Sequence, residues 1–124
     1  MTKPFYPLER QLKKIENFDV MKSPDHPLKL FHYIRTIWHW PDWGYYEHWG
    51  FNFIRKKVFK IECHTGGWSG NECIIQALEK NKWVWAFFWE KSVRGGHFYF
   101  EIDKSYFKKE KGDLPSQPAS SARP

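Results

Sequence analysis

The chain has 124 residues, which corresponds to one domain, and its 20 basic against 14 acidic residues give a net charge of +6. This charge favours polyanionic partners electrostatically without establishing nucleic-acid binding. No apolar run approaches the ~20 residues of a membrane span, so we expect no membrane partner and a cytoplasmic location. Aromatic residues make up 20% of the chain. A domain of this size cannot bury all of them, so some should lie on a partner-binding surface.

Two amphipathic helices are expected near the N-terminus. Residues 7–17 place Leu8, Leu12 and Ile15 at helical spacing. Residues 28–38 also carry apolar side chains at helical intervals, although a strand-like alternation fits part of the same segment. The intervening stretch holds two prolines and turn-forming residues, which predicts a break between the helices.

Residues 38–53 form an aromatic segment interrupted by proline and glycine, which predicts a loop. Because exposed aromatic surface is costly, we favour a lid packed over the second face of the sheet. The alternative is a protein-binding patch, since Trp and Tyr lead interface hot spots. The candidate interface residues are Trp40, Trp43, Tyr45, Tyr46 and Trp49.

The second half of the chain predicts strands and one central helix. The alternation of side chains between two faces predicts three strands, at residues 54–63, 83–91 and 97–103. Apolar residues at helical spacing predict a helix at residues 71–80. Two glycines in residues 92–96 make the last two strands a hairpin.

These elements predict an α+β fold with a small, mainly antiparallel sheet of three or more strands, ending in a C-terminal hairpin. The sheet should pack with the central helix and be joined by the N-terminal helices. We expect residues 1–111 to form a single compact domain. Residues 112–124 have no apolar periodicity and should form a disordered tail.

The hairpin has two candidate registers. His97 pairs with Ser92 in one and with Arg94 in the other, and the same side chains face inward in both. We prefer the first register, because the second sets Glu90 directly opposite Glu101, which like-charge repulsion disfavours.

The most informative segment runs from His64 to Glu72, where a strand is followed by a helix. Ser69 and Glu72 have the spacing of a capping box. Free amides and the positive end of the helix dipole make such a turn favourable for anions. The alternative is that the three glycines of this turn only permit a tight connection.

A binding site is expected if this turn lies beside the hairpin tip at residues 94–97. A helix N-terminus, a guanidinium, two imidazoles and a stacking ring would suit a phosphate or carboxylate attached to a planar group. The alternative is a capped turn and an exposed tip without a ligand. The candidate binding residues are His64, Trp68, Ser69, Asn71, Arg94 and His97.

Metal and catalytic signatures are missing from the sequence. Its six histidines form no His-x₃-His or His-Glu-x-x-His motif, and there is no Cys-x₂-Cys pair, so we expect no metal and no cofactor. Ser69 lacks the full Gly-x-Ser-x-Gly pattern of a nucleophile elbow. Cys63 and Cys73 have apolar neighbours, so we expect buried free thiols in a reducing compartment. These observations favour a protein that is not an enzyme.

The Thr-Gly-Gly-Trp-Ser-Gly-Asn-Glu run at residues 65–72 and the Arg-Gly-Gly-His turn at residues 94–97 resemble motifs of a group of small uncharacterised phage proteins. The resemblance covers residues 64–102 and implies a phage or prophage context, with no catalytic residue to carry over. By analogy with phage accessory proteins, we expect a non-enzymatic binding protein that modulates or inhibits a host protein or defence system. The alternative is a nucleotide- or phosphate-binding domain, or a small enzyme, that uses the two turns.

Overall fold

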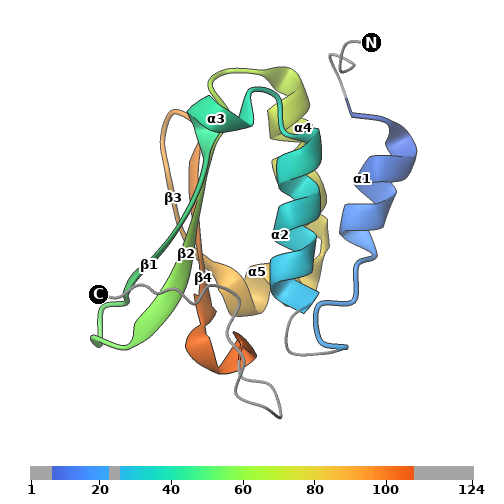
Figure 1. Cartoon of the computed structure of the whole chain (residues 1–124). Helices are drawn as coiled ribbons and strands as arrows, with labels where there is room; N and C mark the ends of the chain where they lie inside the picture. The colour runs from blue at the N-terminus through green and yellow to red at the C-terminus, as the bar shows by residue number, and fades with distance from the viewer. Residues whose placement is uncertain (1–6, 23–25, 108–124) are drawn as a thin grey trace.

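The computed structural model describes residues 7–22 and 26–107 and has two layers. A four-stranded antiparallel sheet forms one layer, and helices cover one of its faces (Figure 1). This confirms the predicted α+β fold with N-terminal helices. The predicted tail at 112–124 lies outside the described residues. No helix within the described ranges is long and apolar enough to cross a membrane.

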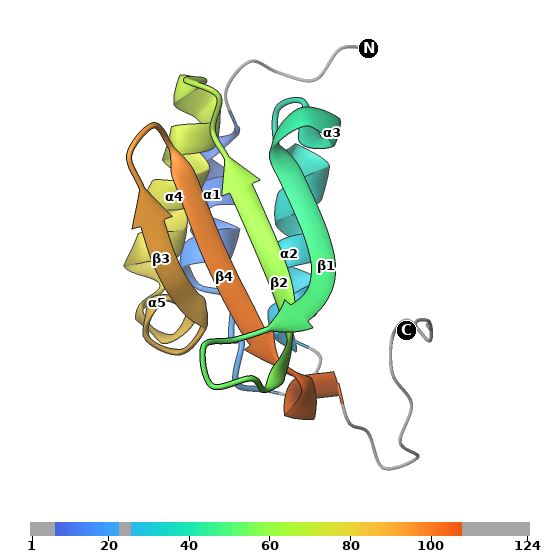
Figure 2. The same cartoon turned by 90° about the vertical axis from the view of Figure 1, so that its left-hand side faces the viewer.

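The sheet has the strand order β1-β2-β4-β3. Its strands are β1 (Tyr45–Phe51), β2 (Lys57–His64), β3 (Trp89–Val93) and β4 (His97–Asp103). Strand β2 lies centrally and pairs antiparallel with β1 on one side and β4 on the other. Figure 2 looks onto the sheet face opposite the described helices, with β1 and β3 at its two edges.

Helices α2 (His26–Ile37) and α4 (Ser69–Lys80) lie against the sheet, and α1 (Glu9–Glu16) packs on α4. Three short helices complete the fold. They are α3 (Pro41–Gly44), α5 (Lys82–Phe88) and the 3₁₀ turn η1 (Lys104–Phe107).

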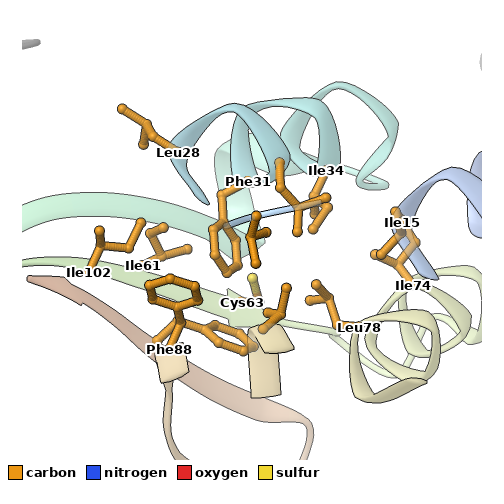
Figure 3. Packing of buried hydrophobic residues seen from close by; sticks show 14 of the residues in the cluster. Ile15, Leu28, Phe31, Ile34, Ile61, Cys63, Ile74, Leu78, Phe88 and Ile102 are labelled. Atoms are coloured by element: carbon orange, nitrogen blue, oxygen red, sulfur yellow. The ribbon is translucent and has the colours of Figure 1, made fainter. Parts of the chain in front are cut away.

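The core lies between the sheet and the helices (Figure 3). Alternate residues of β2 point into it, as predicted for Phe59, Ile61 and Cys63. Helix α4 contributes Ile74 and Leu78, which recur at the four-residue interval of one helix face. The remaining labelled members come from α1, α2, α5 and β4: Ile15, Leu28, Phe31, Ile34, Phe88 and Ile102.

The predicted aromatic loop is wrong, because most of it forms α3 and the edge strand β1. Every residue of β1 has a partner in β2, from Tyr45 opposite Cys63 to Phe51 opposite Lys57. Alternation explains the strand: Tyr45 and Trp49 face the core, while Tyr46 and His48 lie on the open face. Gly50 lies inside the strand and does not interrupt it, so glycine was not a loop signal here. The segment is therefore not a lid over the second face of the sheet.

The predicted strand at residues 83–91 is also wrong in its first half, which is helix α5. Asn81 ends α4 and caps α5, because its side-chain oxygen accepts from the Val84 amide at 3.4 Å. Val84 and Phe88, four residues apart, are buried on one side of this helix. The same two residues also fit a strand alternation, so the pattern alone could not distinguish the two structures.

The hairpin register follows the prediction at one end and departs from it at the tip. Trp89 pairs with Phe100, as the preferred register requires. A bulge at Glu90 then shifts the register by one residue, so that Val93, not Ser92, lies opposite His97. The bulge leaves the apolar side of β4 facing the core.

Candidate functional site

The two glycine-rich turns lie side by side. The Thr65 amide donates a hydrogen bond to the Gly96 carbonyl at 2.8 Å, which joins the turn after β2 to the β3–β4 hairpin tip. Gly96 has a φ of +85°, and a Cβ there would collide with the Thr65 hydroxyl. On the other side, a Cβ at Gly44 of α3 would lie 2.5 Å from the His64 carbonyl oxygen. These close approaches show that Gly44 and Gly96 serve the docking of the turns.

His64 and His97 meet on the open face of the sheet. They are cross-strand partners on β2 and β4, and their Nδ1 atoms lie 2.7 Å apart. His64 Nε2 is also 3.1 Å from one oxygen of Glu62, whose other oxygen is 2.8 Å from His48 Nε2. We call these four residues the histidine row. Tyr46 and Tyr99 flank it, each with its ring centre 5.8 Å from that of His64.

The histidine row forms a continuous set of hydrogen-bonding groups across three strands. If His64 is neutral and donates from Nε2 to Glu62, its Nδ1 accepts from the Nδ1–H of His97. Burial raises the pKa of Glu62, but the hydrogen bonds from His48 and His64 outweigh it and hold the pKa below its ordinary value. The carboxylate therefore orders the imidazoles beside it.

An aromatic cluster lies on the other side of the turn. Trp68 packs against His39 and Trp40, with ring centres 4.5 and 5.5 Å away. Trp40 adopts a left-handed φ of +59°, which is rare for a residue with a side chain. Trp43, in α3, is the most exposed tryptophan of this end of the domain, at 78%.

Asn71 holds this cluster in place. Its side-chain oxygen accepts from the His39 amide at 2.8 Å, and its nitrogen donates to the His39 carbonyl at 3.1 Å and to the Thr65 carbonyl at 3.4 Å. Asn71 is almost fully buried. It is therefore a clamp between the start of α4 and the segment before α3, and its predicted role as a ligand contact does not fit this position.

The predicted capping box at the start of α4 is wrong. The helix begins at Ser69 itself, so Trp68 occupies the cap position and no side chain caps the helix. The Glu72 amide bonds to the Trp68 carbonyl. The exposed Ser69 side chain is free to face a partner, because its position is one residue too late for capping.

The six predicted binding residues thus separate into groups. His64 and His97 lie on the open sheet face, while Trp68 and Ser69 lie at the start of α4. Arg94 is exposed in the β3–β4 hairpin turn, and Asn71 is the one member of the six that is buried. The turns are adjacent, yet Trp68 packs with His39 and Trp40 and not with the paired imidazoles.

The five predicted interface residues also divide. Trp40, Trp43 and Tyr46 are exposed. Tyr45 is buried, with its hydroxyl oxygen 3.0 Å from the Phe31 carbonyl oxygen, so it cannot contact a partner. The Trp49 ring makes edge contacts with the rings of Phe59 and Phe107. Trp49 is therefore partly buried against the core. The strand alternation of β1 explains this division.

An open pocket of about 610 Å³ lies between α2 and β1 and was not predicted. His32 and Glu47 form an ion pair in it at 3.1 Å, and the Tyr45 hydroxyl donates to Glu47 at 2.8 Å. The hydrogen bond to Glu47 raises the pKa of His32. Burial raises the pKa of Glu47, but the hydrogen bonds from His32 and Tyr45 and the charges of His32 and Arg35 together outweigh burial and lower that pKa overall. Because His32 and Glu47 lie on separate elements, no short sequence motif could indicate the pocket.

Within residues 7–22 and 26–107, the fold and site define an α+β arrangement with helices on one sheet face and two docked glycine turns. Comparison of the chain with protein families, curated proteins and solved structures finds no match. Within the described residues, no group of three or more His, Cys, Asp or Glu side chains is arranged to hold a metal ion.

Proposed function

We propose that this protein is a non-enzymatic binding protein that contacts a host protein through the end of the domain formed by its docked turns. The observation that carries the proposal is the exposure of Trp43 and Trp40, at 78% and 57%. Tryptophan is the residue type most enriched at interface hot spots, and solvent exposure of its large ring is costly. We call Trp40, Trp43, Trp68 and Arg94 the contact surface.

The rigidity of the contact surface supports a binding role. The Asn71 clamp fixes the backbone before α3, and the Thr65–Gly96 hydrogen bond fixes the hairpin tip. A surface that is ordered before the partner arrives loses less conformational entropy on association. The left-handed backbone of Trp40 is strained, and such strain persists where the surroundings impose it, which is common at binding sites.

The phage context rests on the resemblance of residues 64–102 to small phage proteins. Proteins of that kind commonly inhibit a host enzyme or defence complex by direct binding. The proposed role is therefore modulation or inhibition of a host protein or defence system, in the cytoplasm of the infected cell.

A second candidate is an anion-binding domain that takes a nucleotide or phosphate. It is favoured by the start of α4, which has no side-chain cap, together with the exposed Arg94 at the neighbouring tip. In that case Arg94→Ala should weaken anion binding by about 1.5–3 kcal/mol. Arg94→Lys should recover only part of the loss, since lysine lacks the bidentate fork.

Native mass spectrometry of the protein purified from host cells distinguishes the two candidates. A retained host protein supports the contact surface, and a retained nucleotide supports the anion site. For a captured partner, Trp40→Ala should weaken binding by about 2 kcal/mol or more. Trp83→Ala on α5 is the matched control, because Trp83 is 54% exposed, close to Trp40. Equal loss in both variants, or no loss in Trp40→Ala, would contradict the proposed surface.

A further inference from the structure

The turn between β1 and β2 presents apolar and basic side chains together. Phe53 is 94% exposed, the highest exposure among the large apolar residues of the described chain, and Phe51 and Ile54 are exposed beside it. The next three residues are Arg55, Lys56 and Lys57, all exposed. We call residues 51–57 the basic–aromatic tip. The tip spans the boundary at residues 53 and 54 between the expected loop and the expected strand, so neither expected element contains it.

The tip has a defined shape. The Asn52 side-chain oxygen accepts from the amides of Ile54 and Lys56 at 3.0 and 2.9 Å. The Asn52 amide donates to the Lys56 carbonyl at 2.9 Å, and the Arg55 amide donates to the Asn52 carbonyl at the same distance. Arg55 adopts a left-handed φ of +67° to complete the turn. These bonds order the backbone that carries Phe53 and Ile54, and neither side chain folds back onto the domain.

The charge of the tip is uncompensated. Residues 51–57 contain three basic and no acidic side chains. Among the described residues, none of the ion pairs involves these three cations, and the Lys57 ammonium lies 5.2 Å from the centre of the Trp49 ring. An anionic partner is therefore complementary to the tip.

The tip lies away from the contact surface. Strand β1 begins at Tyr45 beside α3 and ends at Phe51, so the two features are at opposite ends of this strand (Figure 2). A partner on one does not block the other. The tip is therefore open to a role that the proposed host-protein contact does not use.

We propose that the basic–aromatic tip docks on an anionic lipid bilayer. Phe53 and Ile54 enter the boundary between headgroups and acyl chains, while Arg55, Lys56 and Lys57 contact lipid phosphates. A bilayer accepts any apolar side chain at this depth, whereas single-stranded nucleic acid rewards stacking, which Ile54 cannot provide. Such docking needs no membrane-spanning segment. The proposal therefore departs from the expectation of no membrane partner, which rested only on the absence of an apolar run long enough to span a bilayer.

Co-sedimentation with vesicles tests the proposal. The full chain should bind vesicles of phosphatidylcholine mixed with phosphatidylglycerol, and should not bind vesicles of phosphatidylcholine alone. The double variant Phe53→Ser/Ile54→Ser should lose about tenfold or more of this affinity, because both apolar anchors are removed. Lys56→Gln/Lys57→Gln should also bind more weakly, and raised salt should weaken binding by the wild type.

Matched controls distinguish vesicle binding by the tip from nonspecific adsorption and from effects of the proposed host contact. Trp83→Ala removes an exposed apolar ring elsewhere, and Lys82→Gln removes an exposed cation elsewhere. Both should bind vesicles like the wild type, and so should Trp43→Ala, which changes only the contact surface. Failure of the wild type to bind anionic vesicles, or tip variants that bind these vesicles as tightly as the wild type does, would overturn the proposal. So would tip-dependent binding to a single-stranded oligonucleotide without vesicle binding, which would assign the tip to nucleic acid.

Discussion

The Thr65 amide and the Gly96 carbonyl join the two glycine-rich turns, with Gly96 packed so closely on the Thr65 hydroxyl that no side chain fits there. Within the described residues, the buried hydroxyl of Thr65 has no hydrogen-bond partner. The contact brings together the ends of β2 and the β3–β4 hairpin. It therefore fixes the backbone that carries both the histidine row and the contact surface.

Substitution of Gly96 tests this contact between the two turns, with a second glycine of similar φ as the control. Gly67 has a similar φ of +80°, but a Cβ there would have no neighbour within 4 Å, whereas Gly96 meets Thr65. Gly67→Ala should cost about 1–2 kcal/mol of unfolding free energy for backbone strain alone. Gly96→Ala should cost about 1–3 kcal/mol more, because overpacking is added to the strain. Urea denaturation measures both values, and equal costs would show that the two turns do not dock tightly.

Asn71 is expected to stabilise the fold as well as the contact surface. Asn71→Ala leaves the His39 amide and carbonyl without the clamp, and each buried group that loses its partner costs about 1–3 kcal/mol. We expect a loss of stability in this range or above, measured by urea denaturation. Asn71→Asp is the informative companion, because it keeps the acceptor for the His39 amide but turns a carboxylate oxygen toward the His39 and Thr65 carbonyls, so it should also be destabilising. A variant without Asn71 that is as stable as the wild type would contradict the clamp.

Leu78 tests the packing of α4 on the sheet. It is fully buried in the core, so Leu78→Ala should lower the free energy of unfolding by about 2–5 kcal/mol. The neighbouring Glu79 is exposed, and Glu79→Ala should change stability by less than about 0.5 kcal/mol. A loss below about 0.5 kcal/mol for Leu78→Ala would show that this face of α4 is not core.

The His32–Glu47 pair should make the free energy of unfolding fall both as pH rises and as pH becomes acidic. The pKa of His32 is raised above its ordinary value of 6.5, so its contribution is complete below pH 6.5 and is lost as pH rises through the folded-state pKa. The pKa of Glu47 is lowered, so its contribution is present above its ordinary value of 4.5 and is lost as pH falls through the folded-state pKa. NMR titration of His32 should give a midpoint above 6.5 in the wild type. In Glu47→Gln the midpoint should fall; an unchanged midpoint would show that Glu47 does not cause the shift.

Prediction was most direct for elements whose side-chain period has one interpretation. In β2 buried and partly exposed side chains alternate on either side of Ile61, and in α4 apolar residues recur at helical spacing. Both elements therefore follow from the sequence. Helix α5 did not, since Val84 and Phe88 fit either period and only the Asn81 cap resolves the choice. Strand β1 was missed because Gly50 was interpreted as a break.

The candidate site was harder to predict than the fold. The pairing of His64 with His97 needs β4 to lie beside β2, which is a long-range arrangement that neither strand encodes locally. The split between exposed Tyr46 and buried Tyr45 follows directly once β1 is known to be a strand. The role of Asn71 depends on a segment that lies 32 residues earlier in the chain. Local patterns therefore identified the glycine turns as important but could not separate their packing roles from binding.

Site-specific photo-crosslinking in infected host cells tests the contact surface most directly. A benzophenone amino acid would replace Trp43 in one variant and the exposed Trp83 of α5 in the control. The proposed function predicts a covalent adduct with one discrete host protein from position 43 and none from position 83. An adduct from position 83 alone, or none from position 43, would contradict the assignment of the Trp40–Trp43 end as the partner-binding surface.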